Sequence, residues 1–489
     1  MAEHAQLITY VDRFGGENIA NLHQYLRTNL SEEFQGLHLL PFFYPFDGKD
    51  AGYDPVDNRV VDDRLGDWED IEALGKDFDL MVDMIVNHIS ADSPQFQDVI
   101  KNGSSSPYFD MFLTKNKVFQ TGDSNQIEKI FRPGANLPFT TYKLNTGEQF
   151  EFWTTFSDNQ LDIDVTSTSG REYILNTLRK FAAHGVQYVR LDAIGFAIKK
   201  AGTTCFMLPE TYEFIQGLKE FCNELGMIVL LEVHADYSTQ AKAARHADFV
   251  YDFAIPPLIL HSFETNNFAA LKKWLPRRPK NCVNVLDTHD GIGIYDAAAS
   301  GDDEGMLTDL EIENLGKAIH KNTGGSSELA SGTNAENLDI SHINSSFYDA
   351  MGRNDFDYLG ARAIQLFLPG IPQIYYGGFL AAHNDTALLQ QTNNGRDINR
   401  PYYSFADITQ QLQAEVVLNM RELLVLRNTH PAFQGSFSVL DSQANSFHCS
   451  WNNQNNSCEL LLNLEIAELS INYTNTNQPE EVKTISYVK

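Results

Sequence analysis

The chain has 489 residues, of which 43% are hydrophobic and 21% are charged, and its formal net charge is -29. This balance is typical of a folded protein with a sizeable core. The length exceeds one ordinary domain, but a barrel with insertions would accommodate it. With 65 acidic and 36 basic residues, the surface repels nucleic acid and anionic membranes, so we expect neither as a partner.

The five cysteines are scattered, odd in number and without a CxxC pair, which argues against a disulfide framework or a zinc site. The first residues show no basic region followed by an apolar run, so we expect no secretory signal. No apolar stretch reaches membrane-spanning length. We therefore expect a cytoplasmic protein with no metal or other cofactor. The oligomeric state is open, with a homodimer as one candidate.

Eight short apolar runs recur along the chain, separated by segments with the pattern of amphipathic helices. Continuous apolar runs are typical of strands that are buried on both faces, and their alternation with helices predicts a parallel sheet. Eight such strands favour a closed TIM (β/α)8 barrel. The runs are 7–11, 37–40, 80–86, 186–191, 227–231, 249–251, 283–286 and 371–376.

Two stretches interrupt this alternation. Residues 89–166 and 292–351 are far longer than usual connections, so we expect two inserted subdomains, B and B'. After residue 432 the pattern changes to short alternating runs, which predicts a small all-β domain over 433–489. The barrel is then expected to comprise 1–88, 167–291 and 352–432.

Polar groups follow four of the predicted strands at their carboxyl ends. In a barrel these ends meet at one rim, where catalytic groups lie. One acid after a strand is often only a helix N-cap, but the same coincidence at several strands indicates a catalytic site. Arg190 would keep the buried Asp192 ionised by opposite charge. The groups are His88, Asp192 after Arg190, Glu232 with His234, and His289 with Asp290.

These motifs resemble the α-amylase superfamily, glycoside hydrolase family thirteen. The matching stretches occur in the family's order: 83–88, 190–193, Glu232 and 289–290. Within that superfamily the chain is similar to the sucrose phosphorylase subfamily, including members that act on sucrose 6'-phosphate. The stretches that carry this likeness are 6–10, 40–43, 45–48, 50–52, 285–293 and 393–400.

The resemblance implies a retaining mechanism and a role for particular residues. Asp192 would be the nucleophile and Glu232 the general acid/base, roughly 5 Å apart. Asp290 would stabilise the transition state. The donor glucose pocket would be formed by Asp50, His88, Arg190, His289 and Arg396, with Tyr53 as a stacking platform.

Two further residues have alternative interpretations. Asn87 lies where amylases often bind calcium, but relatives of the sucrose phosphorylase type do not need calcium, so we interpret it as a hydrogen-bonding residue. Phe156, in the predicted subdomain B, is either part of the core or a sugar-contacting residue.

The resemblance implies a phosphorylase that transfers glucose from sucrose, or a related α-glucoside, to inorganic phosphate. A hydrolase or transglucosidase would use the same carboxylates and is an open alternative. A non-enzymatic scaffold is disfavoured, because all three acids are present. Phosphate requires a cation, and Arg132 could supply it, since residues 131–134 resemble the arginine loop of sucrose phosphorylases.

The expected acceptor region departs from the subfamily pattern. Shortly after Asp339, sucrose phosphorylases carry a Tyr-Gln pair where this chain has Ser341 and His342. A histidine can donate from both ring nitrogens and carry positive charge, which suits a phosphate monoester. We therefore expect fructose 6-phosphate as the acceptor, with Arg132 as a second anchor. Loop variation without functional meaning, and a glycerol-type acceptor, are the alternatives.

Overall fold

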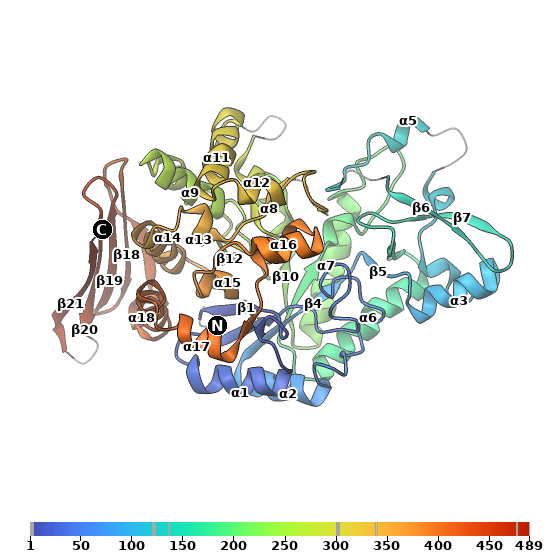
Figure 1. The fold of residues 1–489 in the computed structure, drawn as a ribbon, viewed down its shortest axis with the longest axis horizontal. Coiled ribbons are helices and arrows are strands. Elements are labelled where there is room, and N and C mark those ends of the chain that lie inside the picture. The colour runs from blue at the N-terminus through green and yellow to red at the C-terminus, as the bar shows by residue number, and fades with distance from the viewer. Residues whose placement is uncertain are drawn as a thin grey trace.

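A computed structural model describes residues 4–119, 124–134, 137–299, 304–337, 339, 341–475 and 478–488. Eight parallel strands close into a barrel in the order β1-β15-β12-β11-β10-β9-β4-β3, which confirms the predicted TIM barrel (Figure 1). Each strand coincides with one predicted apolar run. They are β1 (Gln6–Thr9), β3 (Gly36–Leu39), β4 (Asp79–Ile85), β9 (Tyr188–Asp192), β10 (Ile228–Leu231), β11 (Phe249–Tyr251), β12 (Cys282–Asn284) and β15 (Ile371–Tyr375).

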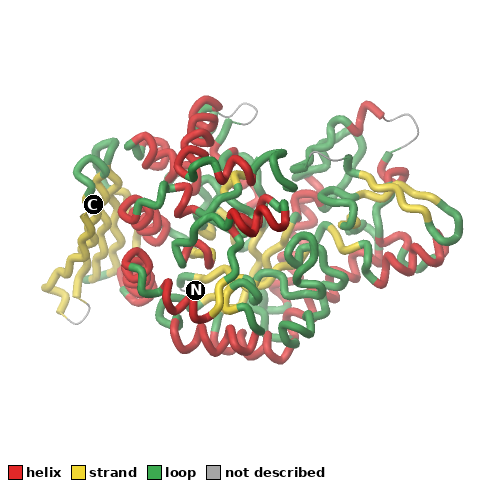
Figure 2. The backbone as a smooth tube through the Cα atoms, viewed as in Figure 1, coloured by secondary structure: helices red, strands yellow, loops and turns green. Residues whose placement is uncertain are grey.

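Helices surround the barrel (Figure 2). The side chain of Ser167 caps the start of α6 (Thr168–Ala183), and α7 (Pro209–Glu224) begins with a proline. The main ones are α1 (Ile19–Asn29), α2 (Trp68–Asp77), α6 (Thr168–Ala183), α7 (Pro209–Glu224), α8 (Tyr237–Ala243), α9 (Ile255–Thr265), α10 (Ala269–Trp274), α14 (Asp355–Phe367) and α18 (Glu415–Thr429).

The chain leaves the barrel for a long excursion between β4 and β9, at the right of Figure 1. Strand β8 pairs antiparallel with β5, so the excursion begins and ends beside the barrel rim. Its elements are β5 (His88–Ser90), α3 (Pro94–Asn102), α4 (Lys115–Val118), α5 (Ser124–Ile127), the hairpin β6 (Phe139–Lys143) and β7 (Gln149–Trp153), and β8 (Gln160–Asp162).

A second excursion lies between β12 and β15. Its hairpin pairs Gly293 of β13 (Ile292–Gly293) with His342 of β14 (His342–Ile343). Between these strands lie α11 (Asp309–Asn322), with a capping box between Thr308 and Glu311, and α12 (Ser326–Ala330); α13 (Phe347–Ala350) follows. The exact bounds of the two inserted subdomains stay a prediction.

The chain ends in a five-stranded antiparallel sheet, which confirms the predicted all-β domain. Trp451 donates its indole N–H to the carbonyl of Phe367 at 2.6 Å and so connects this sheet to α14. Before the sheet come α15 (Tyr376–Phe379), α16 (Thr386–Thr392), α17 (Phe405–Gln411) and the short pair β2 (Phe14–Gly15) and β16 (Tyr403–Ser404). The sheet comprises β17 (Ser436–Val439), β18 (Ser446–Asn453), β19 (Asn456–Asn463), β20 (Glu468–Asn475) and β21 (Gln478–Val488).

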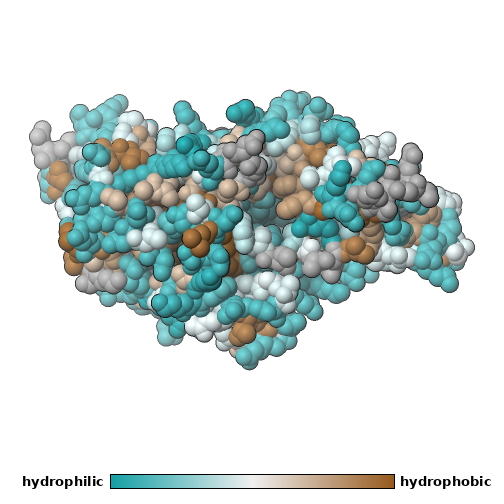
Figure 3. All heavy atoms as spheres, turned by 90° about the horizontal axis from the view of Figure 1, so that it is seen from above, coloured by the Kyte–Doolittle hydropathy of each residue, from teal (hydrophilic) through white to brown (hydrophobic). Residues whose placement is uncertain are grey.

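One hydrophobic core extends from the barrel to the C-terminal sheet. Strand β15 is buried throughout, and in β4 only the first residue, Asp79, is exposed. All five cysteines are buried thiols. Among the described residues, none of the helices has the length and apolarity needed to cross a membrane. The face seen in Figure 3 is largely hydrophilic and has a hollow near its middle.

Candidate active site

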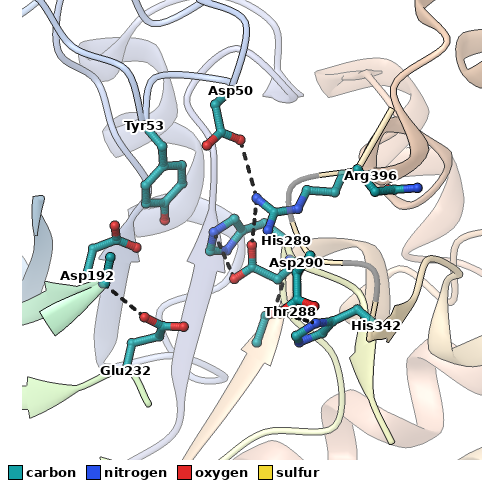
Figure 4. A network of polar contacts seen from close by, with 12 residues as sticks. Asp50, Tyr53, Asp192, Glu232, Thr288, His289, Asp290, His342 and Arg396 are labelled. Atoms are coloured by element: carbon teal, nitrogen blue, oxygen red, sulfur yellow. Dashed lines mark hydrogen bonds and ion pairs between the residues drawn. The ribbon is translucent and has the colours of Figure 1, made fainter. Parts of the chain in front are cut away.

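The predicted catalytic acids line one cavity of about 420 Å³ at the carboxyl ends of the strands. Asp192 is the last residue of β9, Glu232 directly follows β10, and Asp290 lies in the loop after β12 (Figure 4). The cavity is also lined by all but one of the other predicted site residues: Asp50, Tyr53, His88, Arg132, Phe156, His289, Asp339, His342 and Arg396.

Arg190 is the exception, because it lies beneath the cavity and is only 2% exposed. Its Nη1 donates to Asp83 Oδ1 at 2.5 Å and to Asp192 Oδ1 at 2.9 Å. Its Nη2 lies 3.8 Å from Asp290 Oδ2. One buried guanidinium is thus shared by three carboxylates, and it fixes the position of two predicted catalytic acids at once.

Glu232 is held against the residue that follows Asp192. The backbone N–H of Ala193 donates to Glu232 Oε2 at 3.0 Å (Figure 4). Ala193 has a φ of 52°, a left-handed conformation that costs a non-glycine residue about 1–3 kcal/mol. The strained turn therefore directs this N–H toward the carboxylate on the neighbouring strand.

The donor side of the cavity is preorganised by contacts among its own residues. Arg396 Nη1 bridges Asp50 Oδ1 at 3.3 Å and Asp290 Oδ1 at 3.1 Å (Figure 4). The Tyr53 ring stacks on His289 with centroids 4.7 Å apart and planes 2° from parallel. The backbone carbonyl of Tyr53 accepts a hydrogen bond from His88 Nε2 at 2.9 Å. These side chains form a rigid polar pocket around the acids.

Burial and charge act in opposite directions on the two acids that contact Arg190. Burial raises the pKa of Asp192 well above its ordinary value; Arg190 lowers it, but the Glu232 carboxylate adds to the rise. Arg190 therefore favours the ionised form of Asp192, against burial and the charge of Glu232, and the role of Asp192 as a carboxylate nucleophile stays a prediction. The crowded acids favour retention of a proton in the site, as a retaining mechanism requires.

Asp290 differs from Asp192 in its pKa. Burial opposes its ionisation, but the surrounding positive groups lower the pKa of Asp290 well below its ordinary value. Burial also lowers the pKa of His289 well below its usual range, so His289 is neutral at pH 7. The lasting positive charge beside Asp290 comes from Arg396 and Arg190, and Asp290 is a permanent anion.

Basic and aromatic side chains form the outer part of the cavity. Arg132 donates from Nη2 to the carbonyl of Thr155 at 2.9 Å, and Phe156 packs against His88 with ring centroids 5.3 Å apart. His342 Nδ1 lies 3.0 Å from Asp339 Oδ2. Burial raises the pKa of Asp339, but the contact with His342 outweighs it and lowers the pKa. The residues proposed for the acceptor region thus lie on the same cavity as the acids.

Sequence reasoning missed several residues of this cavity. His234 was predicted to lie at the rim but no role was predicted for it, and Asp296 belongs to no motif. Burial disfavours the charged form of His234, yet Asp296 and Glu232 raise its pKa to about 9, so it is a cation at neutral pH. The aromatic wall of the cavity was also missed; it comprises Phe131, Phe196, Phe206 and Tyr295.

A lysine ammonium occupies the place beside Asn87. Lys199 Nζ donates to Asn87 Oδ1 at 3.0 Å and lies 2.7 Å from Asp162 Oδ2. It also donates to the carbonyl of Phe196. The side chains of Lys199 and Asp162 are 1% and 0% exposed. A protein cation already satisfies the three oxygens, which supports the interpretation of Asn87 as a hydrogen-bonding residue.

Substitution of Lys199 by alanine should lower the free energy of unfolding by about 3–5 kcal/mol, because Asp162 would stay buried without its cation. The matched control is Lys200→Ala, whose exposed side chain should matter by less than about 0.5 kcal/mol. Urea unfolding followed by circular dichroism measures both. Chelators should leave the wild-type Tm unchanged. A fall in Tm that calcium reverses would contradict this account.

Comparisons with known proteins agree with this architecture. The sequence-family model of the α-amylase catalytic domain matches residues 24–292 of this chain. Sucrose phosphorylase from Agrobacterium vitis is 47% identical, over 97% of this chain and 96% of that protein. Glucosylglycerol phosphorylase from Marinobacter adhaerens is 37% identical, over 97% of each chain.

Among solved structures, the crystal structure of sucrose 6F-phosphate phosphorylase from Thermoanaerobacter thermosaccharolyticum superposes with a TM-score of 0.91 and 35% identity, over 100% of this chain and 98% of that one. The match to the catalytic-domain model and these full-length likenesses point to one family. The chain belongs to the α-amylase family and, within it, to the sucrose phosphorylase group.

Proposed function

We propose that this protein is a retaining glycoside phosphorylase that transfers glucose from sucrose or sucrose 6'-phosphate to inorganic phosphate. The observation that carries the proposal is that one cavity is lined both by Asp192, Glu232 and Asp290 and by the cationic side chains of Arg132 and His234. The products are α-glucose 1-phosphate and fructose or fructose 6-phosphate. Family membership supports the same reaction.

In the first step, a carboxylate oxygen of Asp192 attacks the anomeric carbon as the bond to the fructosyl oxygen breaks. Glu232 donates its proton to that leaving oxygen. The permanent negative charge of Asp290 stabilises the positive charge that develops on the sugar ring. Asp50, His88, His289 and Arg396 hold the glucose hydroxyls, and the ring of Tyr53 provides an apolar contact.

In the second step, a phosphate oxygen attacks the anomeric carbon and releases Asp192, so two inversions give net retention. Glu232 accepts the acceptor's proton. Phosphate must approach a protein of net charge -29, and it therefore needs cations close to the reacting carbon. Arg132 and His234 lie on the same cavity and supply this charge, and His342 adds a further ring nitrogen there.

The proposed setting is the cytoplasm, where sugar phosphates are retained and thiols stay reduced. That the chain forms a homodimer stays a prediction.

Phosphorolysis is tested by incubating the protein with sucrose, or with sucrose 6'-phosphate, and inorganic phosphate. Glucose 1-phosphate should form at a rate that depends on phosphate concentration and should greatly exceed free glucose. The coupled assay for glucose 1-phosphate and a glucose oxidase assay measure the two products. Free glucose as the main product at saturating phosphate would identify a hydrolase, and transfer only to sugars would identify a transglucosidase.

The two central carboxylates should differ in their dependence on the leaving group. Asp192→Asn should lower kcat for every donor by far more than tenfold. A tenfold loss corresponds to about 1.4 kcal/mol of activation free energy. Glu232→Gln should impair sucrose much more than α-glucosyl fluoride, because fluoride leaves without protonation. Steady-state kinetics with both donors measure this. Retention of a tenth of kcat in Asp192→Asn, or equal losses for both donors in Glu232→Gln, would refute the assignments.

We further propose fructose 6-phosphate as the preferred acceptor in the synthetic direction. His342 is buried in the cavity wall, and its Nε2 makes no hydrogen bond to any described residue. With glucose 1-phosphate as donor, kcat/KM for fructose 6-phosphate should exceed that for fructose by about tenfold or more, about 1.4 kcal/mol.

His342→Ala should abolish this preference, whereas the control His383→Ala, which changes an exposed histidine, should retain it. Equal or better use of fructose by the wild type would refute the fructose 6-phosphate proposal. A preference for glycerol would instead identify a glycerol-type phosphorylase.

A further inference from the structure

A buried carboxylate that the mechanism does not use lies at the edge of the cavity. Asp296 belongs to the 3₁₀ turn Tyr295–Ala297 after β13 and is 4% exposed. A buried carboxylate is costly unless it is paired. Its Oδ2 lies 3.5 Å from Nδ1 of His234, and its Oδ1 accepts a hydrogen bond from Gln240 Nε2 at 3.2 Å. Gln240, in α8, thus orients the carboxylate toward His234.

The ring of His234 is fixed by its neighbours. One face stacks on Phe253 with centroids 3.8 Å apart, and the edge meets the ring of His342 at 4.3 Å and 86°. Its Nε2 lies 3.5 Å from Glu232 Oε1. Neither ring nitrogen makes a well-directed hydrogen bond within the part of the chain described. Because Nδ1 faces Asp296, Nε2, on the side of Glu232, is the nitrogen that can meet a ligand in the cavity.

A glycine makes room for this arrangement. A Cβ at Gly293 would collide with Asp296 Oδ2 and would lie 3.4 Å from His342 Nε2. Gly293 pairs with His342 across the β13–β14 hairpin. The hairpin and its flanking residues thus bring His342 and Asp296 beside His234. The second insertion therefore supplies the partners of a residue that belongs to the barrel.

We propose that Asp296 is a positioning residue that holds His234 as the oxyanion contact of the acceptor region, and so sets the affinity for inorganic phosphate. The inference rests on the proposed phosphorolysis. It separates the two half-reactions: Asp296 supports attack by phosphate but contributes little to formation of the glucosyl-enzyme.

The charges around His234 favour this role. Asp296, Glu232 and Asp290 face the ring from three different loops, with His342 on β14 and Asp236 at the start of α8 also on the cavity. Burial lowers the pKa of His234, but Asp296 contributes most to raising it to about 9. A group with a raised pKa keeps its proton below that value and loses it as the pH rises through it.

The test compares the two half-reactions in Asp296→Asn. The value of kcat/KM for phosphate should fall about tenfold or more, whereas kcat/KM for α-glucosyl fluoride should change by less than about threefold. In the wild type, kcat/KM for phosphate should fall above about pH 9, and in Asp296→Asn this fall should begin at lower pH. Asp296→Glu should restore part of the loss, and the control Glu313→Gln, at an exposed site on α11, should change nothing.

A second variant guards against a simple folding defect. His234→Gln should reproduce the selective loss, and adding Asp296→Asn to it should cause little further loss, since both act through one contact. Equal losses in both half-reactions without rescue by Asp296→Glu would overturn the proposal, as would an unchanged kcat/KM for phosphate. If the wild type shows no dependence on phosphate, the proposed function itself fails.

Discussion

A single buried guanidinium organises the site. Arg190 lies in the middle of β9 and contacts Asp83, Asp192 and Asp290, which come from three different strands or the loops after them. Removing any one carboxylate would leave this cation underpaired, and removing the cation would leave several acids buried without compensation. Arg190 reduces the repulsion between the predicted catalytic acids that lie around it. Arg190 itself is only 2% exposed, so it is shielded from solvent.

The cavity contains both fixed negative and fixed positive charges. At the base, Arg190 and Arg396 fix Asp290 as an anion, where a developing positive charge needs stabilisation. On the same cavity, His234 and Arg132 provide positive groups in a protein that is otherwise strongly acidic. A local positive potential of this kind would attract an anionic acceptor, although the surrounding acidic surface repels it. We therefore infer that these side chains select the acceptor.

The sequence was sufficient to predict the barrel, because its eight strands are buried on both faces and read as continuous apolar runs. The residues at the strand ends were predictable for the same reason, since the rim follows from the fold. Asp296 and Lys199 could not be found this way. Each acts through a partner distant in sequence, His234 or Asp162, and neither position has a local pattern. The effect of burial on the pKa of Asp192 also could not be predicted, because the depth of a side chain is not visible in the sequence.

The central claim is that a covalent glucosyl group on Asp192 precedes transfer to phosphate. Its most direct test is mass spectrometry of the Glu232→Gln variant, quenched rapidly after mixing with α-glucosyl fluoride in the absence of phosphate. The account predicts that the peptide containing Asp192 gains the mass of one glucosyl group, and that added phosphate releases it as α-glucose 1-phosphate. A label on any other residue, or release of the β-anomer, would contradict it.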